Sequence, residues 1–223
     1  MAAKQQIKVY NKMASVQENA GDNFIDGVMG VNKTGKSSTQ KKVAQIWRDT
    51  HDSSMQIWGY DYQKKFGNLI PSGNHIDIRN DKDWALKCCK LRNGLLILDE
   101  LKMGYKNPQH PPPGLETLFS QCCHWNLSIL WSCHNPAQAP EVCTIHTNIY
   151  HIFLMYFKKR QFTEKIPNAW ICITAANQVR KYVKLHGKGY HKLDPNYRGQ
   201  GHPYIIVNMD NQTTKAVNMN QPF

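Results

Sequence analysis

Residues 30–37 read Gly-Val-Asn-Lys-Thr-Gly-Lys-Ser and complete the pattern GxxxxGKS. Its glycines let the backbone fold closely around a phosphate group. A β-like run, residues 24–29, precedes this glycine loop, and a segment with one apolar face, residues 38–49, follows it. Strand, glycine loop and helix in this order are the context that a phosphate-binding loop requires. The pattern therefore predicts an α/β fold that binds a nucleoside triphosphate.

Each position of the glycine loop has a predicted role in holding ATP and Mg²⁺. Backbone N–H groups of the loop and of the following helix N-terminus point at phosphate oxygens. Lys36 can reach the β- and γ-phosphates, and the Ser37 hydroxyl can ligate Mg²⁺. The predicted ATP-binding set is Gly30, Asn32, Lys33, Thr34, Gly35, Lys36, Ser37 and Ser38.

A second motif, residues 94–100, reads Gly-Leu-Leu-Ile-Leu-Asp-Glu. Open α/β sheets bind ligands beyond the carboxyl ends of their strands, and the two carboxylates directly follow a predicted strand. We therefore expect Asp99 to hold Mg²⁺ and Glu100 to polarise the attacking water. Together with the glycine loop, this motif predicts an ATPase. A carboxylate next to the metal ligand favours hydrolysis over transfer to a small acceptor.

Short β-like runs alternate with helical segments, which predicts a RecA-like P-loop NTPase fold with a mostly parallel central sheet flanked by helices. Residues 95–98 and 149–156 are almost continuously apolar, as in strands that are buried on both faces. The expected strands are residues 24–29, 55–60, 76–78, 95–98, 127–132 and 149–157, and the expected helices are residues 38–49, 84–91, 115–125 and 175–184.

The length of 223 residues suits one ATPase domain, which we assign to residues 21–223. A basic N-terminal arm, residues 1–20, precedes it, and a basic loop, residues 185–203, leads into a C-terminal hairpin, residues 204–219. A net charge of +12 and a pI near 9.4 favour a polyanionic partner. No stretch approaches the roughly 18–20 apolar residues of a membrane span, and no signal peptide is evident. We therefore expect an intracellular protein.

Seven cysteines, with two adjacent pairs, do not suit a disulfide framework. Cys143 and His146 have the spacing of half a zinc site, but a second pair at structural spacing is missing. Buried cysteines acting as small apolar side chains are the preferred interpretation. A zinc site in the Cys/His-rich segment 122–146 remains the alternative.

The order of the remaining segments resembles the HerA/FtsK superfamily of DNA-pumping ATPases. Residues 127–136 look like the superfamily strand that ends in a polar sensor residue before a proline, and residues 55–61 and 147–153 resemble two further core strands. The short chain with its plain two-motif core is most similar to the genome-packaging ATPases of tailless icosahedral viruses with double-jelly-roll capsids. The resemblance covers residues 22–157.

This resemblance implies a homo-oligomeric ring, a hexamer or a pentamer, that hydrolyses ATP between subunits and moves DNA. Capsid or portal-vertex proteins are implied as further partners, and the host cytoplasm or the virion as the location. His134 stands where the superfamily sensor is usually Gln, and its imidazole can still hydrogen-bond a γ-phosphate or water. His151 stands nearest to the expected trans-acting arginine, so Arg160 becomes the candidate finger. The expected catalytic set is Lys36, Glu100, His134 and Arg160.

Basic residues outside the two motifs are candidates for contacts with DNA phosphates, which a translocase grips without reading sequence. They are Lys102, Lys106, Lys188, Lys192 and Arg198. Three alternatives remain open: a DNA-transfer or phage-morphogenesis ATPase of the same superfamily, a P-loop kinase, and a nucleic-acid-binding scaffold with a degenerate loop. A kinase should carry an arginine-rich lid and an acceptor pocket, which the sequence does not show. The complete motifs argue against the scaffold.

Overall fold

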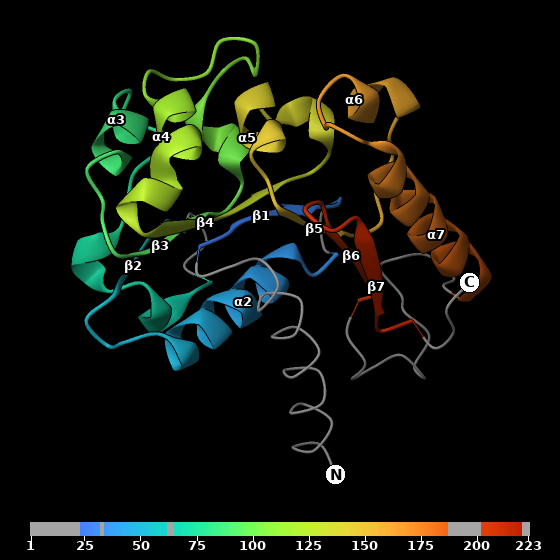
Figure 1. Ribbon diagram of the computed structural model, residues 1–223, viewed down its shortest axis with the longest axis horizontal. Helices are drawn as coiled ribbons and strands as arrows, with labels where there is room; N and C mark the ends of the chain where they lie inside the picture. Colours follow the sequence, from blue (N-terminus) through green and yellow to red (C-terminus); the bar gives the residue numbers. More distant parts are fainter. Residues whose placement is uncertain (1–22, 32–33, 62–64, 187–201, 220–223) are drawn as a thin grey trace.

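The computed structural model describes residues 23–31, 34–61, 65–186 and 202–219, and these ranges form one central sheet with helices on both faces (Figure 1). The strands are β1 (Ile25–Met29), β2 (Gln56–Tyr60), β3 (Gly94–Leu98), β4 (Leu127–Cys133), β5 (Ile149–Ile152), β6 (Tyr204–Asn208) and β7 (Thr213–Val217). The α-helices are α2 (Lys36–Thr50), α3 (Trp84–Cys88), α4 (Leu115–Gln121), α5 (Glu141–Ile145), α6 (Lys159–Thr163) and α7 (Trp170–His186). The 3₁₀ turns are η1 (Gly67–Leu69), η2 (Ser72–Asn74), η3 (Leu101–Gly104), η4 (Cys122–Trp125) and η5 (Pro136–Gln138).

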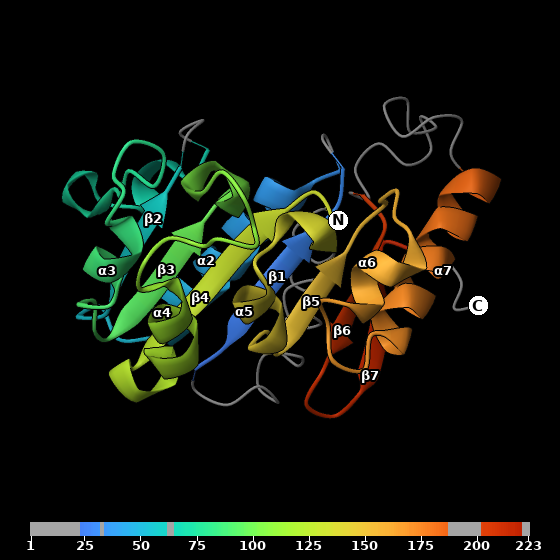
Figure 2. The ribbon, with the colours of Figure 1, turned by 90° about the horizontal axis from the view of Figure 1, so that it is seen from above.

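The seven strands lie in the order β2-β3-β4-β1-β5-β6-β7 (Figure 2). Strands β1 to β5 run parallel, and the β6–β7 hairpin runs antiparallel at one end of the sheet. Parallel strands bring their carboxyl ends to a common edge, where open α/β sheets bind ligands. The strand β4 separates β1, which leads into the glycine loop, from β3, which leads into Asp99.

Two apolar cores hold the layers together. Helix α2 lies on one face of the sheet in Figure 1, and its buried side chains include Val43, Ile46 and Trp47. Helices α3, α4, α5 and α7 cover the opposite face. The five residues of β3 are buried without exception, as are those of β1. Burial on both faces explains the almost continuous apolar sequence of β3.

The structure confirms the predicted fold class, including the mostly parallel sheet and the C-terminal hairpin. It differs from the sequence prediction at residues 76–78, where no strand forms. An isolated bridge joins Gly59 to His75, the residue that precedes this segment. The Asp77 carboxylate accepts the backbone N–H groups of Arg79 and Asn80, both at 3.0 Å, and these bonds turn the chain away from the sheet.

Several other elements differ in length from the prediction. The strand expected over residues 149–157 ends at Ile152, although the next three residues stay buried. There the Leu154 carbonyl accepts the Val31 N–H at 3.0 Å, so the segment supports the glycine loop. The helix expected over residues 115–125 is divided into α4 and η4, and α7 begins five residues before the predicted position 175. The sequence analysis missed α5 and α6 altogether.

Candidate active site

The glycine loop joins β1 to α2 at the carboxyl edge of the sheet. Gly35 has φ 88°, a left-handed conformation that favours glycine, and α2 begins without a side-chain cap or an acidic residue in its first turn. A Cβ atom on Gly30 would lie 2.6 Å from the Cβ of Phe153, so that position excludes any side chain. The loop therefore presents uncapped helix N–H groups, which suits a phosphate.

Side chains within the loop close it on itself. The Thr34 hydroxyl donates to the Val31 carbonyl at 2.8 Å. The Lys36 ammonium donates to the carbonyls of Gly30 at 2.8 Å and Val31 at 3.3 Å. Burial lowers the pKa of Lys36, and the nearby charge of Glu100 partly opposes this shift. Ser38 is exposed on α2, whereas Asn32 and Lys33 lie outside the described residues.

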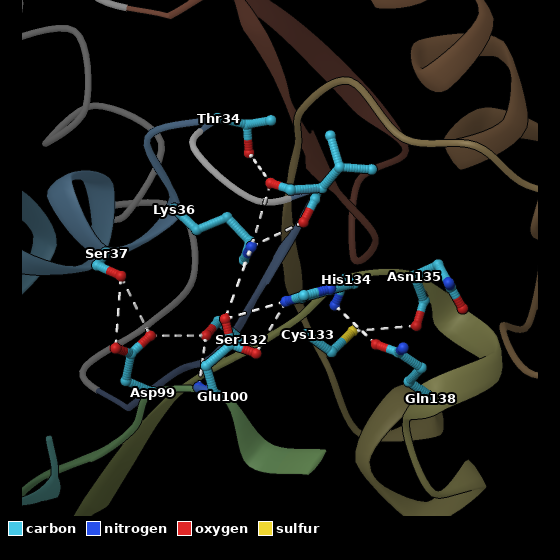
Figure 3. Close-up of polar contacts among 12 residues, drawn as sticks. Thr34, Lys36, Ser37, Asp99, Glu100, Ser132, Cys133, His134, Asn135 and Gln138 are labelled. Atoms are coloured by element: carbon cyan, nitrogen blue, oxygen red, sulfur yellow. Dashed lines mark hydrogen bonds and ion pairs between the residues drawn. The ribbon is translucent and has the colours of Figure 1, made fainter. Parts of the chain in front are cut away.

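The Ser37 hydroxyl reaches the Asp99 carboxylate, with Oγ 3.3 Å from Oδ1 and 3.4 Å from Oδ2 (Figure 3). Asp99 is 2% exposed, and this burial raises its pKa, while the charge of Lys65 and the hydroxyl groups of Ser132 and Ser37 act in the opposite direction. A hydroxyl and a buried carboxylate are the hard oxygen donors that Mg²⁺ prefers. The two side chains therefore fit the metal that an ATP site requires.

Glu100 faces two basic side chains. The Nε2 atom of His134 lies 3.1 Å from Oε1 and 3.0 Å from Oε2 of Glu100, and the Lys36 ammonium lies 3.9 Å from Oε1 (Figure 3). Burial raises the pKa of Glu100, but the His134 hydrogen bond and the Lys36 charge outweigh it, so that the net shift is downward. Glu100 also has φ 57°, which is uncommon for a residue other than glycine. It is held as a carboxylate in a constrained backbone position.

Ser132, which the sequence analysis missed, joins the two carboxylates from the end of β4. Its Oγ accepts the Glu100 backbone N–H at 2.9 Å and donates to Asp99 Oδ1 at 3.1 Å. The sequence signal was a polar residue near the carboxyl end of a mostly apolar strand. Recognising it required knowing that β4 adjoins β3.

A second set of contacts, also missed, leads from His134 to the segment after Glu100. The Gln138 side-chain carbonyl accepts the His134 backbone N–H at 3.2 Å, and the Tyr105 hydroxyl donates to the Gln138 backbone carbonyl. Burial raises the pKa of Tyr105, so the hydroxyl stays protonated. The segment that carries Tyr105 also carries Lys102 and Lys106, and both lysines are exposed.

The remaining predicted residues lie apart from this cluster. Arg160 is exposed on α6, and its Nε lies 2.5 Å from Oε1 of Glu164, the residue that follows this helix. His151 is 3% exposed, and its Nε2 lies 3.3 Å from Asp26 Oδ2 in the buried sheet. This burial prevents His151 from acting as a finger toward another subunit. Lys188, Lys192 and Arg198 lie outside the described residues.

Cysteines contribute no metal centre to the described ranges. Within them, no group of three or more His, Cys, Asp or Glu side chains is arranged to hold a metal ion. All seven cysteines are free, and burial raises the pKa of Cys133 to about 12. A thiol in that state is a poor metal ligand because the thiolate is the form that binds.

None of the helices in the described ranges combines the length and apolar character that crossing a bilayer demands.

Comparison with known proteins gives similarity in structure alone. No protein-family model matches the sequence, and no curated protein does. The genome-packaging NTPase B204 of Sulfolobus turreted icosahedral virus 2, solved with AMP, superposes with a TM-score of 0.63 at 17% identity, over 91% of this chain and 99% of that one. The same NTPase solved with AMPPCP gives 0.62 at 16% identity, over 91% and 99% of the two chains. The cytoplasmic domain of the type VII secretion ATPase EccC of Thermomonospora curvata gives 0.55 at 10% identity, over 90% of this chain and 24% of that one. This protein therefore has the P-loop NTPase fold of the packaging NTPase B204 and is similar in fold to the secretion ATPase EccC.

Proposed function

We propose that this protein is an ATPase that hydrolyses MgATP at the carboxyl edge of its sheet. One observation carries the proposal: the glycine loop and the acidic motif meet there, with Ser37 Oγ 3.3 Å from Asp99 and Lys36 Nζ 3.9 Å from Glu100. Phosphate-binding and water-activating groups must lie this close to act on one γ-phosphate. The B204 structures with AMP, ATP-gammaS and AMPPCP show that a chain of this fold accommodates adenine nucleotides.

Each side chain has a distinct part in the proposed reaction. Lys36 exchanges its loop carbonyls for phosphate oxygens, and Ser37 and Asp99 hold the metal, which when bound neutralises charge on the phosphates. Glu100, ionised beside His134, accepts the proton of the attacking water. His134 positions Glu100, and Ser132 fixes the backbone between Asp99 and Glu100.

We further propose that hydrolysis drives DNA through a homo-oligomeric ring, a hexamer or a pentamer, and that this ring packages a viral genome. The net charge of +12 favours a polyanion, and the exposed Lys102 and Lys106 lie in the segment that follows Glu100. The fold spans 99% of the packaging NTPase B204. In such a ring, Arg160 would leave Glu164 to complete a neighbouring site. Capsid or portal-vertex proteins would be partners in the host cytoplasm or virion.

The test combines ATP turnover with native mass spectrometry of the same preparation. We expect Mg²⁺-dependent phosphate release that rises with added double- or single-stranded DNA, and a mass of five or six subunits. ATP turnover by a monomer that DNA does not stimulate would contradict the translocase proposal and favour a small-molecule kinase. Absence of any turnover by the oligomer would contradict the ATPase itself.

A matched pair of variants examines the DNA contacts. The double change of Lys102 and Lys106 to Ala should weaken DNA binding. It should also reduce the slope of log K against log salt concentration by about two, since each phosphate contact releases counterions. The same change at Lys82 and Lys90, which are also exposed, removes equal charge elsewhere and should have a smaller effect. Equal losses from both pairs would show that the lysines after Glu100 have no special role.

A further inference from the structure

A second lysine, Lys65, enters the candidate active site from the segment that follows β2. Its ammonium donates to Ser37 Oγ at 3.1 Å, and the same hydroxyl lies 3.3 Å from Asp99. The charge of Lys65 lowers the pKa of Asp99 and also lowers that of Lys36, so it acts on both halves of the site. Neither sequence motif contains this residue.

The backbone beneath Lys65 is anchored on both sides. Asp61, directly after β2, accepts the backbone N–H of Lys65 at 2.8 Å and that of Phe66 at 2.7 Å. Phe66 is 1% exposed and belongs to the core between the sheet and α2, together with Ile70. A carboxylate and a buried aromatic ring therefore fix the point from which the Lys65 side chain reaches Ser37.

The positive charge of Lys65 compensates the negative charge of the buried Asp99 carboxylate. A buried carboxylate such as Asp99 is costly unless a cation or hydrogen bonds compensate it. Lys65 brings a positive charge to Ser37 and Asp99, the two side chains that fit Mg²⁺. An ammonium group and Mg²⁺ repel each other, so the two cations compete for the position beside Ser37 and Asp99. With the metal bound, the Lys65 ammonium would leave Ser37, while its backbone N–H stays held by Asp61.

We propose that Lys65 is a nucleotide-binding residue that exchanges partners with Mg²⁺. In the metal-free site its ammonium lies beside Ser37 and Asp99 and supplies the positive charge that pairs with the polyphosphate of the same subunit. With the metal bound, Lys65 yields both that place and that role. The assignment rests on the proposed ATPase function and adds a second lysine to it. It makes the affinity for metal-free ATP depend on a residue outside both motifs.

The test is a ratio of two ATP dissociation constants, both measured calorimetrically. The constant in EDTA is divided by the constant in excess Mg²⁺. Lys65→Met keeps the length of the side chain and removes its charge. We expect this variant to raise the ratio about tenfold, because a charge-assisted bond to phosphate is lost and binding relies more on the metal. Lys65→Arg should stay near the wild-type ratio, and Lys41→Met, at an exposed position of α2, should leave it unchanged.

General damage to the site would weaken ATP binding in both buffers and leave the ratio as it was. An unchanged ratio for Lys65→Met, with wild-type ATP binding intact, would overturn the role of Lys65 and spare the ATPase proposal. Failure of the wild-type protein to bind ATP in either buffer would instead overturn the ATPase proposal, and the role of Lys65 with it.

Discussion

The Ser37 hydroxyl lies 3.3 Å from the Asp99 carboxylate, although 62 positions separate the two residues in sequence. The contact exists because β1 and β3 are parallel members of one sheet and end at the same edge, with β4 between them. The phosphate-binding loop follows β1, and the acidic pair follows β3. The proposed chemistry depends on this meeting of the two motifs.

Lys36→Ala should abolish ATP hydrolysis. The lysine ammonium has no equivalent in alanine, and its bonds to the Gly30 and Val31 carbonyls, which close the loop, are lost as well. We expect turnover to fall at least about a hundredfold, as when other charge-stabilising donors are removed. Steady-state phosphate release measures this, with Lys41→Ala on the exposed face of α2 as the control. Turnover within a few-fold of wild type would exclude Lys36 from the reaction.

Ser132→Ala should slow hydrolysis about tenfold to a hundredfold, because Glu100 loses the acceptor for its backbone N–H and Asp99 loses a donor. Ser128→Ala is the matched control, since Ser128 lies on the same strand and its Oγ accepts the Phe24 N–H at 3.3 Å. Both variants should lose about 1–3 kcal/mol of stability to an unpaired buried N–H. Equal turnover in the two would show that the position of Ser132 near the carboxylates is irrelevant.

Asp99→Asn should leave the nucleotide-free protein at least as stable as wild type at pH 7 while removing the effect of Mg²⁺ on ATP binding. Burial raises the pKa of Asp99, so the Asp99 carboxyl group binds its proton more tightly in the folded state than in the unfolded state. The charged carboxylate therefore costs stability above its folded pKa, and the cost disappears as the pH falls through that value toward the ordinary value of 3.8. Thermal melts at pH 7 and near pH 3.8 measure the difference. A variant less stable than wild type at pH 7 would contradict this electrostatic account.

Tyr105→Phe should reduce the stimulation of ATP hydrolysis by DNA. The tyrosine hydroxyl connects the segment bearing Lys102 and Lys106 to Gln138, whose side chain holds the His134 N–H. Phenylalanine keeps the ring and removes this bond, so we expect near-normal basal turnover with reduced stimulation by DNA. Phosphate release with and without DNA gives the ratio. Full stimulation in the variant would mean that the signal takes another route.

The fold was predictable because the motifs that specify it are short, contiguous stretches of sequence. A glycine loop between a strand and a helix, and the apolar run of β3 ending in Asp99, specify a parallel sheet with its site at one edge. The prediction of a strand over residues 76–78 was wrong. The Asp77 carboxylate accepts the N–H groups of Arg79 and Asn80 and forms a turn there in place of a strand.

The parts of the candidate site that sequence reasoning missed all depend on strand order and loop paths. Ser132 matters because β4 lies beside β3, and Lys65 matters because Asp61 holds its backbone N–H while its side chain reaches Ser37. Neither relation leaves a spacing pattern in the sequence. His151 stands nearest to the position expected for a trans-acting arginine, and its burial beside Asp26 agrees with the decision to look elsewhere for the finger.

The most direct measurement compares ATP binding and ATP turnover in Glu100→Gln. Glutamine keeps the size of the side chain and can still face His134, but it cannot accept the proton of the attacking water. We predict an ATP dissociation constant within about threefold of wild type and turnover reduced by at least about a hundredfold, the lower end of the range for general acid–base catalysis. Hydrolysis at the wild-type rate would contradict the assignment of Glu100 and the active site built around it.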